Sequence, residues 1–298
     1  MPEHQSIAPL PSEKVVTFGI VTGQHHLSWE TLAEQWQLAE QVGFDSLWLF
    51  DHFLALYDDP EGQTLEASTL LAGLAAKTAR ARLGVLVYGN THRNPAILAK
   101  EMVTVDHISN GRAILGIGAG WNEPEHAMYS IPFPSPGDRV GMLDEALTAM
   151  ESFFTNDRTT FAGKHYTFVN APFAPKPVQA KLPVLIGGKR PKMLRVIARH
   201  ADIWDAGGSP EEVAAAGAII DQHCAEFGRA PGSVVRGVSL GADRLENEAG
   251  FERIVRDYHA VGVRQFLFDF PITTAGIDTA VRIARDVIPG LRAEFAEG

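Results

Sequence analysis

Two titratable residues, Asp51 and His52, follow directly after the apolar run at 47–50. The unperturbed pKa of histidine is about 6.5, so a histidine at a strand end can accept or donate a proton near neutral pH. Adjacent residues of an extended chain point in opposite directions, so we expect only one of this pair, and only one of His25 and His26, to face a cavity. The pattern predicts an acid–base site. A loop-capping aspartate beside an exposed histidine is the alternative.

A glycine pair and a basic pair, Gly187, Gly188, Lys189 and Arg190, separate an apolar run from a helix expected to start near Pro191. The glycines leave backbone N–H groups accessible, the helix start carries partial positive charge, and the two cations add full charges. These residues favour a phosphate site. An exposed basic pair on the surface is the alternative.

Three glycines, Gly116, Gly118 and Gly120, occur in the segment LGIGAGWNEPE. The dinucleotide fingerprint G-x-G-x-x-G is absent, because Trp121 follows Gly118 by three residues and Glu123 follows Gly120 by three. Glycines at a strand end instead let a flat ring approach the backbone, since no side chain blocks it. Packing of a barrel explains the same glycines equally well.

Other chemistries lack their residues. The eleven histidines show no His-x-His or His-x-x-x-His spacing at a strand end, so we expect no metal centre. No serine nucleophile elbow is present. The single cysteine, Cys224, cannot form a disulfide within the chain, which fits a reducing compartment.

Composition narrows the class of protein further. The 298 residues are 45% apolar and carry a net charge of −10, which excludes a disordered or coiled-coil chain. The acidic balance argues against a nucleic-acid partner and a membrane surface. We find no signal peptide or apolar stretch of about 18 residues, and we expect a soluble, cytoplasmic protein.

The elements that must position these residues form a repeat of short apolar runs, each followed by a stretch with helical spacing. Ser28, for example, is a candidate cap for a helix over 29–41. Eight such units predict an α/β fold, a single (β/α)8 TIM barrel. The expected strands are 15–21, 46–50, 82–87, 113–118, 184–186, 201–204, 233–240 and 265–268.

The repeat is interrupted after the fourth unit. Residues 156–182 are rich in proline and predict an insertion with a short hairpin rather than a separate domain. We therefore expect one domain over 1–298, with residues 1–13 flexible.

Reactive groups of such barrels lie at the C-terminal ends of the strands. The polar and glycine residues that follow the expected strands are His25, His26, Asp51, His52, Tyr88, Asn90, His92, Ala119, Gly120, Trp121, Glu123, Gly187, Gly188, Lys189, Arg190, Asp205, Gly207 and Gly208.

Together these features resemble the luciferase-like flavin and deazaflavin oxidoreductases over nearly the whole chain. The likeness is carried by AEQVGFDSLWLFDHF at 39–53, LGVLVYGNTHRNPAILAK at 83–100, VDHISNGRAILGIGAGWNEPEH at 105–126, PKPVQAKLPVLIGG at 175–188 and ARHADIWD at 198–205. Each segment alone is weakly specific, and the set is specific for the family.

The resemblance implies a ring-bearing cofactor in the barrel mouth, either coenzyme F420 or FMN. Members that resemble this chain through DHF and GNTHRNP mostly use F420, which favours the deazaflavin. The resemblance places Asp51 and His52 beside the ring, with His52 as the acid or base. It also implies a cis peptide bond at Leu86–Val87 against the ring. Ala119 and Gly120 would lie at the edge of the ring, and Gly187, Gly188 and Lys189 would hold the phosphate. Arg190, the second residue of the basic pair, is added to the phosphate site.

One departure concerns the substrate. The F420-dependent glucose-6-phosphate dehydrogenases of this family carry a tryptophan four residues after the histidine and a glutamate directly after the loop glycine, where this chain has Leu56 and Trp121. A sugar phosphate is therefore disfavoured, and Trp121 indicates an apolar or aromatic substrate face unless it only covers the barrel mouth. Tyr88 and His25 are further candidate substrate contacts. The substrate itself stays open.

Three functions are compatible with these observations. The first is hydride transfer between F420 and a small organic substrate, with His52 exchanging the proton. The second is a monooxygenase that uses reduced FMN and oxygen. The third, a flavin-binding barrel without catalysis, ranks last because Asp51, His52, Asn90 and the glycine-rich anion loop are retained. The resemblance also implies a homodimer, for which Leu71, Leu74 and Ala75 could supply an apolar face, although burial in the core explains them as well.

Overall fold

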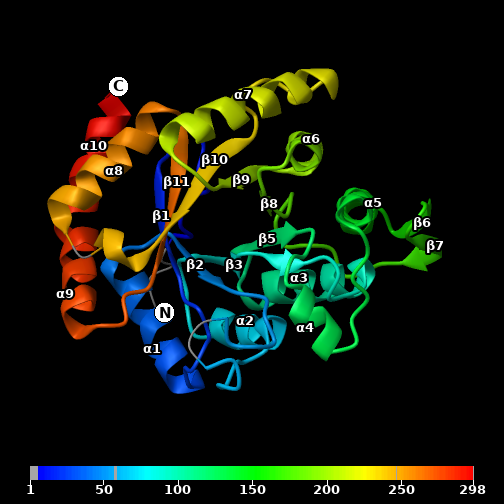
Figure 1. Cartoon of the computed structure of the whole chain (residues 1–298), viewed down its shortest axis with the longest axis horizontal. Coiled ribbons are helices and arrows are strands. Elements are labelled where there is room, and N and C mark those ends of the chain that lie inside the picture. Colours follow the sequence, from blue (N-terminus) through cyan, green and yellow to red (C-terminus); the bar gives the residue numbers. More distant parts are fainter. Residues whose placement is uncertain (1–5, 57–58, 246, 298) are drawn as a thin grey trace.

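Parallel strands close a barrel at the centre of the molecule (Figure 1). The computed structural model describes residues 6–56, 59–245 and 247–297. Within them, eight strands pair in the order β3-β2-β1-β11-β10-β9-β8-β5, and pairing of β3 with β5 completes the ring. The strands are β1 (Thr17–Val21), β2 (Ser46–Leu49), β3 (Arg82–Val85), β5 (Ala113–Gly118), β8 (Val184–Gly187), β9 (Ile203–Ala206), β10 (Val235–Leu240) and β11 (Val263–Asp269). The predicted TIM barrel is confirmed.

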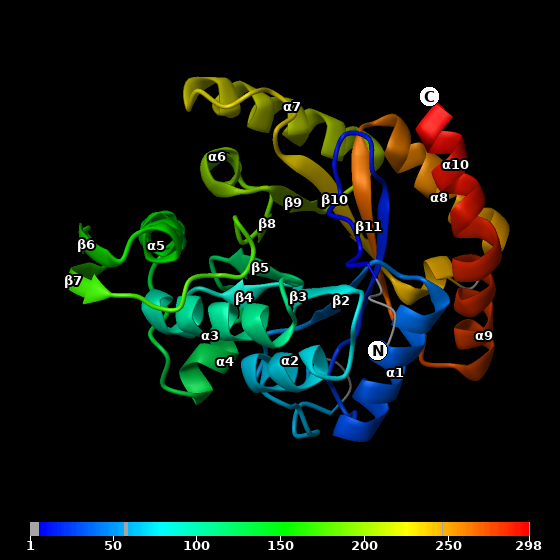
Figure 2. The same ribbon diagram turned by 180° about the vertical axis from the view of Figure 1, so that it is seen from behind.

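Helices surround the barrel on its outer side (Figures 1 and 2). They are α1 (Trp29–Val42), α2 (Ala67–Ala75), α3 (Pro95–Ile108), α4 (Glu123–Met128), α5 (Pro136–Thr155), α6 (Pro191–His200), α7 (Pro210–Glu226), α8 (Glu248–Ala260), α9 (Thr274–Arg282) and α10 (Ile288–Glu297). A 3-10 turn at Ala242–Leu245 precedes α8, and a π-helical turn at Ile283–Val287 joins α9 to α10.

Local sequence explains where helices begin. Ser28 accepts a hydrogen bond from Thr31 N and caps α1 as predicted, and Gly43, at φ 109°, ends that helix. Asn94 caps α3 before Pro95, whose fixed φ suits the first helical turn.

Strand alternation produces two apolar layers. Val21, Trp48, Ile114, Leu185, Ile203 and Leu267 pack against one another as a cluster inside the barrel. Their neighbours along each strand point outward and form the larger core with the helices; Phe18, Leu47 and Phe266 are examples, all fully buried.

The insertion contains the antiparallel hairpin of β6 (Arg158–Ala162) and β7 (Thr167–Pro172), as predicted. Both views place the hairpin beside α5 at the end of the molecule opposite α8 and α10 (Figures 1 and 2). The returning chain is anchored where Asp106 accepts hydrogen bonds from Val178 N and from Gln179 N and Nε2. This contact returns the chain to the barrel in time for β8.

Two sequence-based expectations need correction. The predicted flexible segment 1–13 lies partly outside the described residues, but its part from residue 6 onward is attached to the barrel: Ala8 is buried and donates its N–H to Arg80 O. The apolar residues of α2 considered for a dimer, Leu71, Leu74 and Ala75, are buried against their own core, so they offer no face to a partner.

We searched the described helices for one that could span a membrane and found none long and apolar enough.

Candidate active site

A buried carboxylate, Asp51, follows the end of β2 and is held by three donors. Its Oδ2 accepts hydrogen bonds from Gly89 N at 2.9 Å, His92 Nδ1 at 3.0 Å and Arg93 Nη1 at 2.7 Å. Burial opposes ionisation, but His92 and Arg93 outweigh it and hold the pKa of Asp51 below its usual value. Oδ1 is also buried, yet no atom of the described residues donates to it.

Arg93 ties this carboxylate to two helices. Its Nη2 donates to Glu66 at 2.5 Å, and Glu66 in turn caps the start of α2. Its Nε lies 3.6 Å from Glu101 of α3. The guanidinium therefore joins the end of β2, the start of α2 and the middle of α3.

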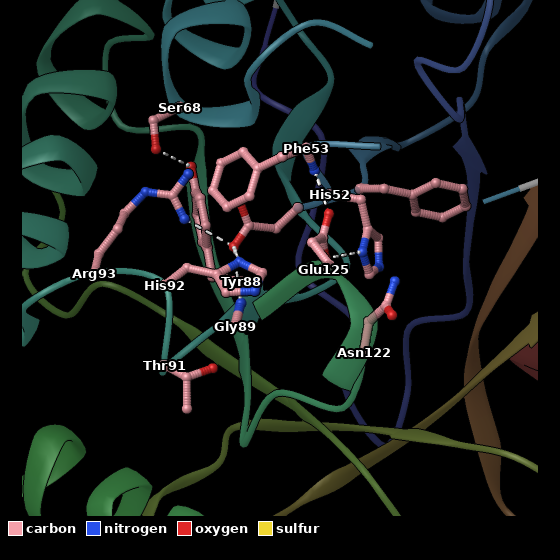
Figure 3. A network of polar contacts seen from close by, with 12 residues as sticks. His52, Phe53, Ser68, Tyr88, Gly89, Thr91, His92, Arg93, Asn122 and Glu125 are labelled. Carbon is pink, nitrogen blue, oxygen red and sulfur yellow. Dashed lines mark hydrogen bonds and ion pairs between the residues drawn. The ribbon is translucent and has the colours of Figure 1, made fainter. Parts of the chain in front are cut away.

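His52 points away from Asp51 and meets a different carboxylate. Its Nδ1 lies 2.9 Å from Oε2 of Glu125, which belongs to α4 and is completely buried (Figure 3). The other oxygen of Glu125 accepts Phe53 N at 2.5 Å and Leu54 N at 3.3 Å. Burial disfavours the ionised form, but the hydrogen bonds from His52 and Phe53 outweigh it and lower the pKa of Glu125.

Asp51 and His52 both line a cavity of about 150 Å³ at the barrel mouth, although they bond to different partners. The expectation that only one of the two faces a cavity is therefore wrong, because the chain has left the extended strand β2 at Leu49 and the alternation of side chains no longer separates them. Trp121 forms one wall; its ring meets the His52 ring edge-on, with centroids 5.6 Å apart, and 66% of Trp121 is exposed. The predicted acid–base pair and the candidate substrate residue thus share one cavity.

Another part of the cavity wall is the segment from Leu86 to Gly89, which connects β3 to β4 and includes the short strand β4 (Tyr88–Gly89). The Leu86–Val87 peptide bond is cis, as the resemblance implied. Tyr88 belongs to this wall, but its side chain is fully buried, and its hydroxyl accepts a hydrogen bond from Ser68 Oγ at 3.2 Å. The phenol packs beside Arg93, and a contact between Tyr88 and a substrate stays a prediction.

Gly120 has a conformation that a side chain would disturb. It adopts φ +80°, and a Cβ atom built on it would lie 2.3 Å from Thr91 Oγ1. On Gly118 a Cβ would lie 2.9 Å from Val87 Cγ2. Both glycines keep the loop after β5 close to the β3–β4 segment, and Ala119 between them packs against the main core.

The glycine-rich anion loop lies at the start of α6. Gly188 adopts φ +130°, and its carbonyl accepts Trp204 Nε1 at 2.8 Å. Lys189 and Arg190 are exposed, and Arg190 precedes the helix without a capping side-chain bond. The loop follows β8, whose last residue is Gly187; a Cβ atom built on Gly187 would lie 3.8 Å from Val87 Cγ2, an ordinary van der Waals distance.

Two other strand-end candidates, His25 and Asp205, are not among the residues that line this cavity. His25 Nδ1 accepts Leu56 N at 3.3 Å, and burial, followed by the charges of His52 and His26, lowers the pKa of His25. Asp205, at the end of β9, accepts Ser239 Oγ at 2.8 Å, while burial raises the pKa of Asp205 to about 6.

Sequence reasoning did not assign two residues of this network, Arg93 and Glu125. Arg93 lies within the GNTHRNP segment beside His92, and Glu125 lies four residues after Trp121, in the first turn of α4. The charge on each of these two residues, so close to candidate site residues, was a signal that could have identified them. Their partners depend on the loop conformations, which pattern reading does not supply.

The matched profile and the fold together define the class. The chain matches the luciferase-like monooxygenase profile over residues 15–268, and it belongs to that family.

Particular relatives are more specific. The chain is 33% identical to the F420-dependent glucose-6-phosphate dehydrogenase of Amycolatopsis mediterranei over 55% of its own length and 49% of the relative's. It is 29% identical to the phthiodiolone/phenolphthiodiolone dimycocerosates ketoreductase of Mycobacterium bovis over 76% of its own length and 65% of the relative's. The chain thus spans less than two thirds of either relative.

Solved structures agree in fold. An F420-dependent secondary alcohol dehydrogenase in complex with an F420–acetone adduct superposes with a TM-score of 0.83 at 19% identity, covering 93% of this chain and 99% of that one. A monooxygenase from Streptomyces bottropensis superposes with a TM-score of 0.70, also at 19% identity, covering 92% of this chain and 99% of that one. At such identities the likeness concerns the barrel alone.

Proposed function

We propose that this protein is an oxidoreductase that transfers hydride between coenzyme F420 and a small organic substrate. The observation that carries the proposal is one cavity lined by both His52 and Asp51, whose buried Oδ1 has no donor in the described part of the chain. The F420-dependent relatives support the choice of cofactor.

The residues of the mouth fit a deazaflavin. An ionised Asp51 can only accept hydrogen bonds, so its unused Oδ1 calls for an N–H or O–H donor, which the polar edge of such a ring carries. Gly118 presents no side chain beside Val87, and Gly120 presents none beside Thr91. The backbone N–H groups at the start of α6, with Lys189 and Arg190, suit the cofactor's phosphate.

Bound F420 would supply the centre that accepts or gives up hydride. His52 would then take the hydroxyl proton of an alcohol substrate while the C–H bond of that alcohol gives up hydride, and a carbonyl product would result. In the reverse reaction, His52 would return the proton to the carbonyl oxygen. Asp51 stays ionised and holds the ring edge. Trp121 covers the substrate with an apolar face.

The absence of the two sugar-phosphate residues directs the choice of substrate. Leu56 and Trp121 replace a tryptophan and a glutamate of the glucose-6-phosphate dehydrogenases, so we propose an apolar alcohol or carbonyl compound rather than a sugar phosphate. The names of the relatives, a ketoreductase and a secondary alcohol dehydrogenase, agree with that pair of functional groups.

The test mixes the purified protein with F420 and a panel of primary and secondary alcohols, or with reduced F420 and the matching ketones, and follows deazaflavin fluorescence. Removal of a general acid or base costs about 10²–10⁴-fold, so His52→Ala should lose at least 10²-fold in turnover and keep its affinity for F420. The matched control is His223→Ala, which changes a histidine on the surface of α7. Turnover only with reduced FMN and oxygen would contradict the proposal and favour the monooxygenase reading.

A further inference from the structure

We infer that Glu125 is a positioning residue that decides which ring nitrogen of His52 carries the proton. The inference rests on the proposed proton transfer by His52, and it concerns a residue that does not line the cavity. Glu125 would act on the reaction only through the histidine.

The carboxylate is fixed in its own position first. Its Oε1 accepts two consecutive backbone N–H groups, those of Phe53 and Leu54, and its side chain is completely buried. With one oxygen occupied by the backbone that follows His52, the other can point only at the His52 ring (Figure 3). The histidine and its partner are therefore held by the same short loop.

The charge on Glu125 then selects the tautomer. An ionised carboxylate has no proton to give, so the 2.9 Å contact requires His52 Nδ1 to be the donor. Its other neighbours are donors too, which keeps the carboxylate ionised. In neutral His52 the lone pair must then lie on Nε2.

Nε2 is on the side of the ring away from Glu125. His52 lines the cavity while Glu125 does not, so this nitrogen is the one available to a substrate. Trp121, from the loop that leads into α4, contacts the ring edge-on. The segment after β5 thus meets the ring twice, by a hydrogen bond from α4 and by a ring contact from the preceding loop.

Glu125→Gln keeps the shape but not the charge. A glutamine has one acceptor oxygen for the two sets of donors, and its amide can donate to His52 Nδ1 and move the proton to Nε2. We expect kcat to fall about 10²-fold with KM changed less than about threefold.

The decisive experiment is ¹⁵N NMR of the imidazoles in the whole protein, which reads the tautomer without any turnover. Wild type should show His52 protonated at Nδ1, and Glu125→Gln should shift population toward Nε2–H. Glu40→Gln is the control, because Glu40 also accepts three backbone N–H groups, those of Ala79, Arg80 and Ala81, at the other end of the barrel.

The outcomes separate the two proposals. Wild-type His52 protonated at Nε2, or a tautomer unchanged in Glu125→Gln, overturns the role of Glu125 even if His52→Ala abolishes turnover. A shifted tautomer together with an unaffected His52→Ala rate supports the role of Glu125 in the structure and defeats the proposed function. If both hold, adding Glu125→Gln to His52→Ala should cost nothing further, because one residue acts through the other.

Discussion

At the scale of single residues, the site contains two neighbours with different partners. Asp51 is held by Gly89, His92 and Arg93 and keeps one unused oxygen, whereas His52 bonds to Glu125 and meets the Trp121 ring. Both side chains line the same cavity, so their partners, and not the alternation of a strand, distinguish them. Under the proposed function, Asp51 would hold the cofactor and His52 would move the proton.

Asp205 provides a prediction about pH at the same scale. Burial raises the pKa of Asp205 to about 6, against about 4 in an unfolded chain. The folded protein therefore binds more protons between these values, and its stability falls as the pH rises through that window. Asp205→Asn removes the titrating group. Thermal unfolding gives the Tm of wild type minus the Tm of Asp205→Asn, and this difference should fall by about 2–5 °C between about pH 4.5 and 7.5. A difference that stays constant over this range would contradict the raised pKa of Asp205.

Sequence alone could identify the residues whose place depends on the strand that precedes them. Asp51, His52, Ala119, Gly120 and Trp121 all lie where the barrel pattern puts them, at the mouth. Glu125 could not be assigned, because it reaches His52 only through the turn that starts α4. Tyr88 follows its strand as expected, but its ring turns into the core, a choice that packing around Ser68 and Arg93 makes.

At the scale of elements, Arg93 joins the end of β2 to α2 and α3 and predicts a large loss of stability. Arg93→Met leaves Asp51 buried with one cation fewer, and breaking a buried pair costs about 3–5 kcal/mol. Arg256→Met, an exposed arginine paired with Glu252 and Glu294, should cost less than about 1 kcal/mol. Urea unfolding measures both, and equal effects would contradict this account of Arg93.

The contribution of Asp51 to the stability of the folded protein depends on pH in a defined direction. Because the pKa of Asp51 is lowered on folding, its contribution is present above the unfolded value near 4 and is lost as the pH falls through the folded value. The advantage of wild type over Arg93→Met should therefore shrink in acid.

Gly120 predicts how strictly the loop after β5 is built. Gly120→Ala must strain a φ of +80° and also displace Thr91 Oγ1. Gly228→Ala is a matched control, since Gly228 has φ +72° and no heavy atom within 4 Å of its added Cβ. Both should lose about 1–2 kcal/mol for the backbone, but only Gly120→Ala should lose additional stability and turnover. Equal losses in the two variants would show that the contact with Thr91 is unimportant.

At the scale of the whole molecule, the barrel and its insertion follow from patterns that lie close together in sequence. Each strand run and helix start is local, so all eight units were predictable, as was the hairpin within 156–182. How the first residues meet the barrel was not predictable, because Ala8 bonds to Arg80, seventy-two positions away. The same limit applies to substrate specificity, which long loops at the mouth determine.

Binding of F420 at the barrel mouth is the property on which the proposed hydride transfer depends. A parallel titration of the purified protein with F420 and with FMN at one salt concentration, followed by fluorescence, measures it. We predict low-micromolar affinity for F420, weaker binding of FMN, and at least tenfold weaker F420 binding in Asp51→Asn, which changes the acceptor with the unused oxygen. Tighter binding of FMN, or binding of neither molecule, would contradict the account.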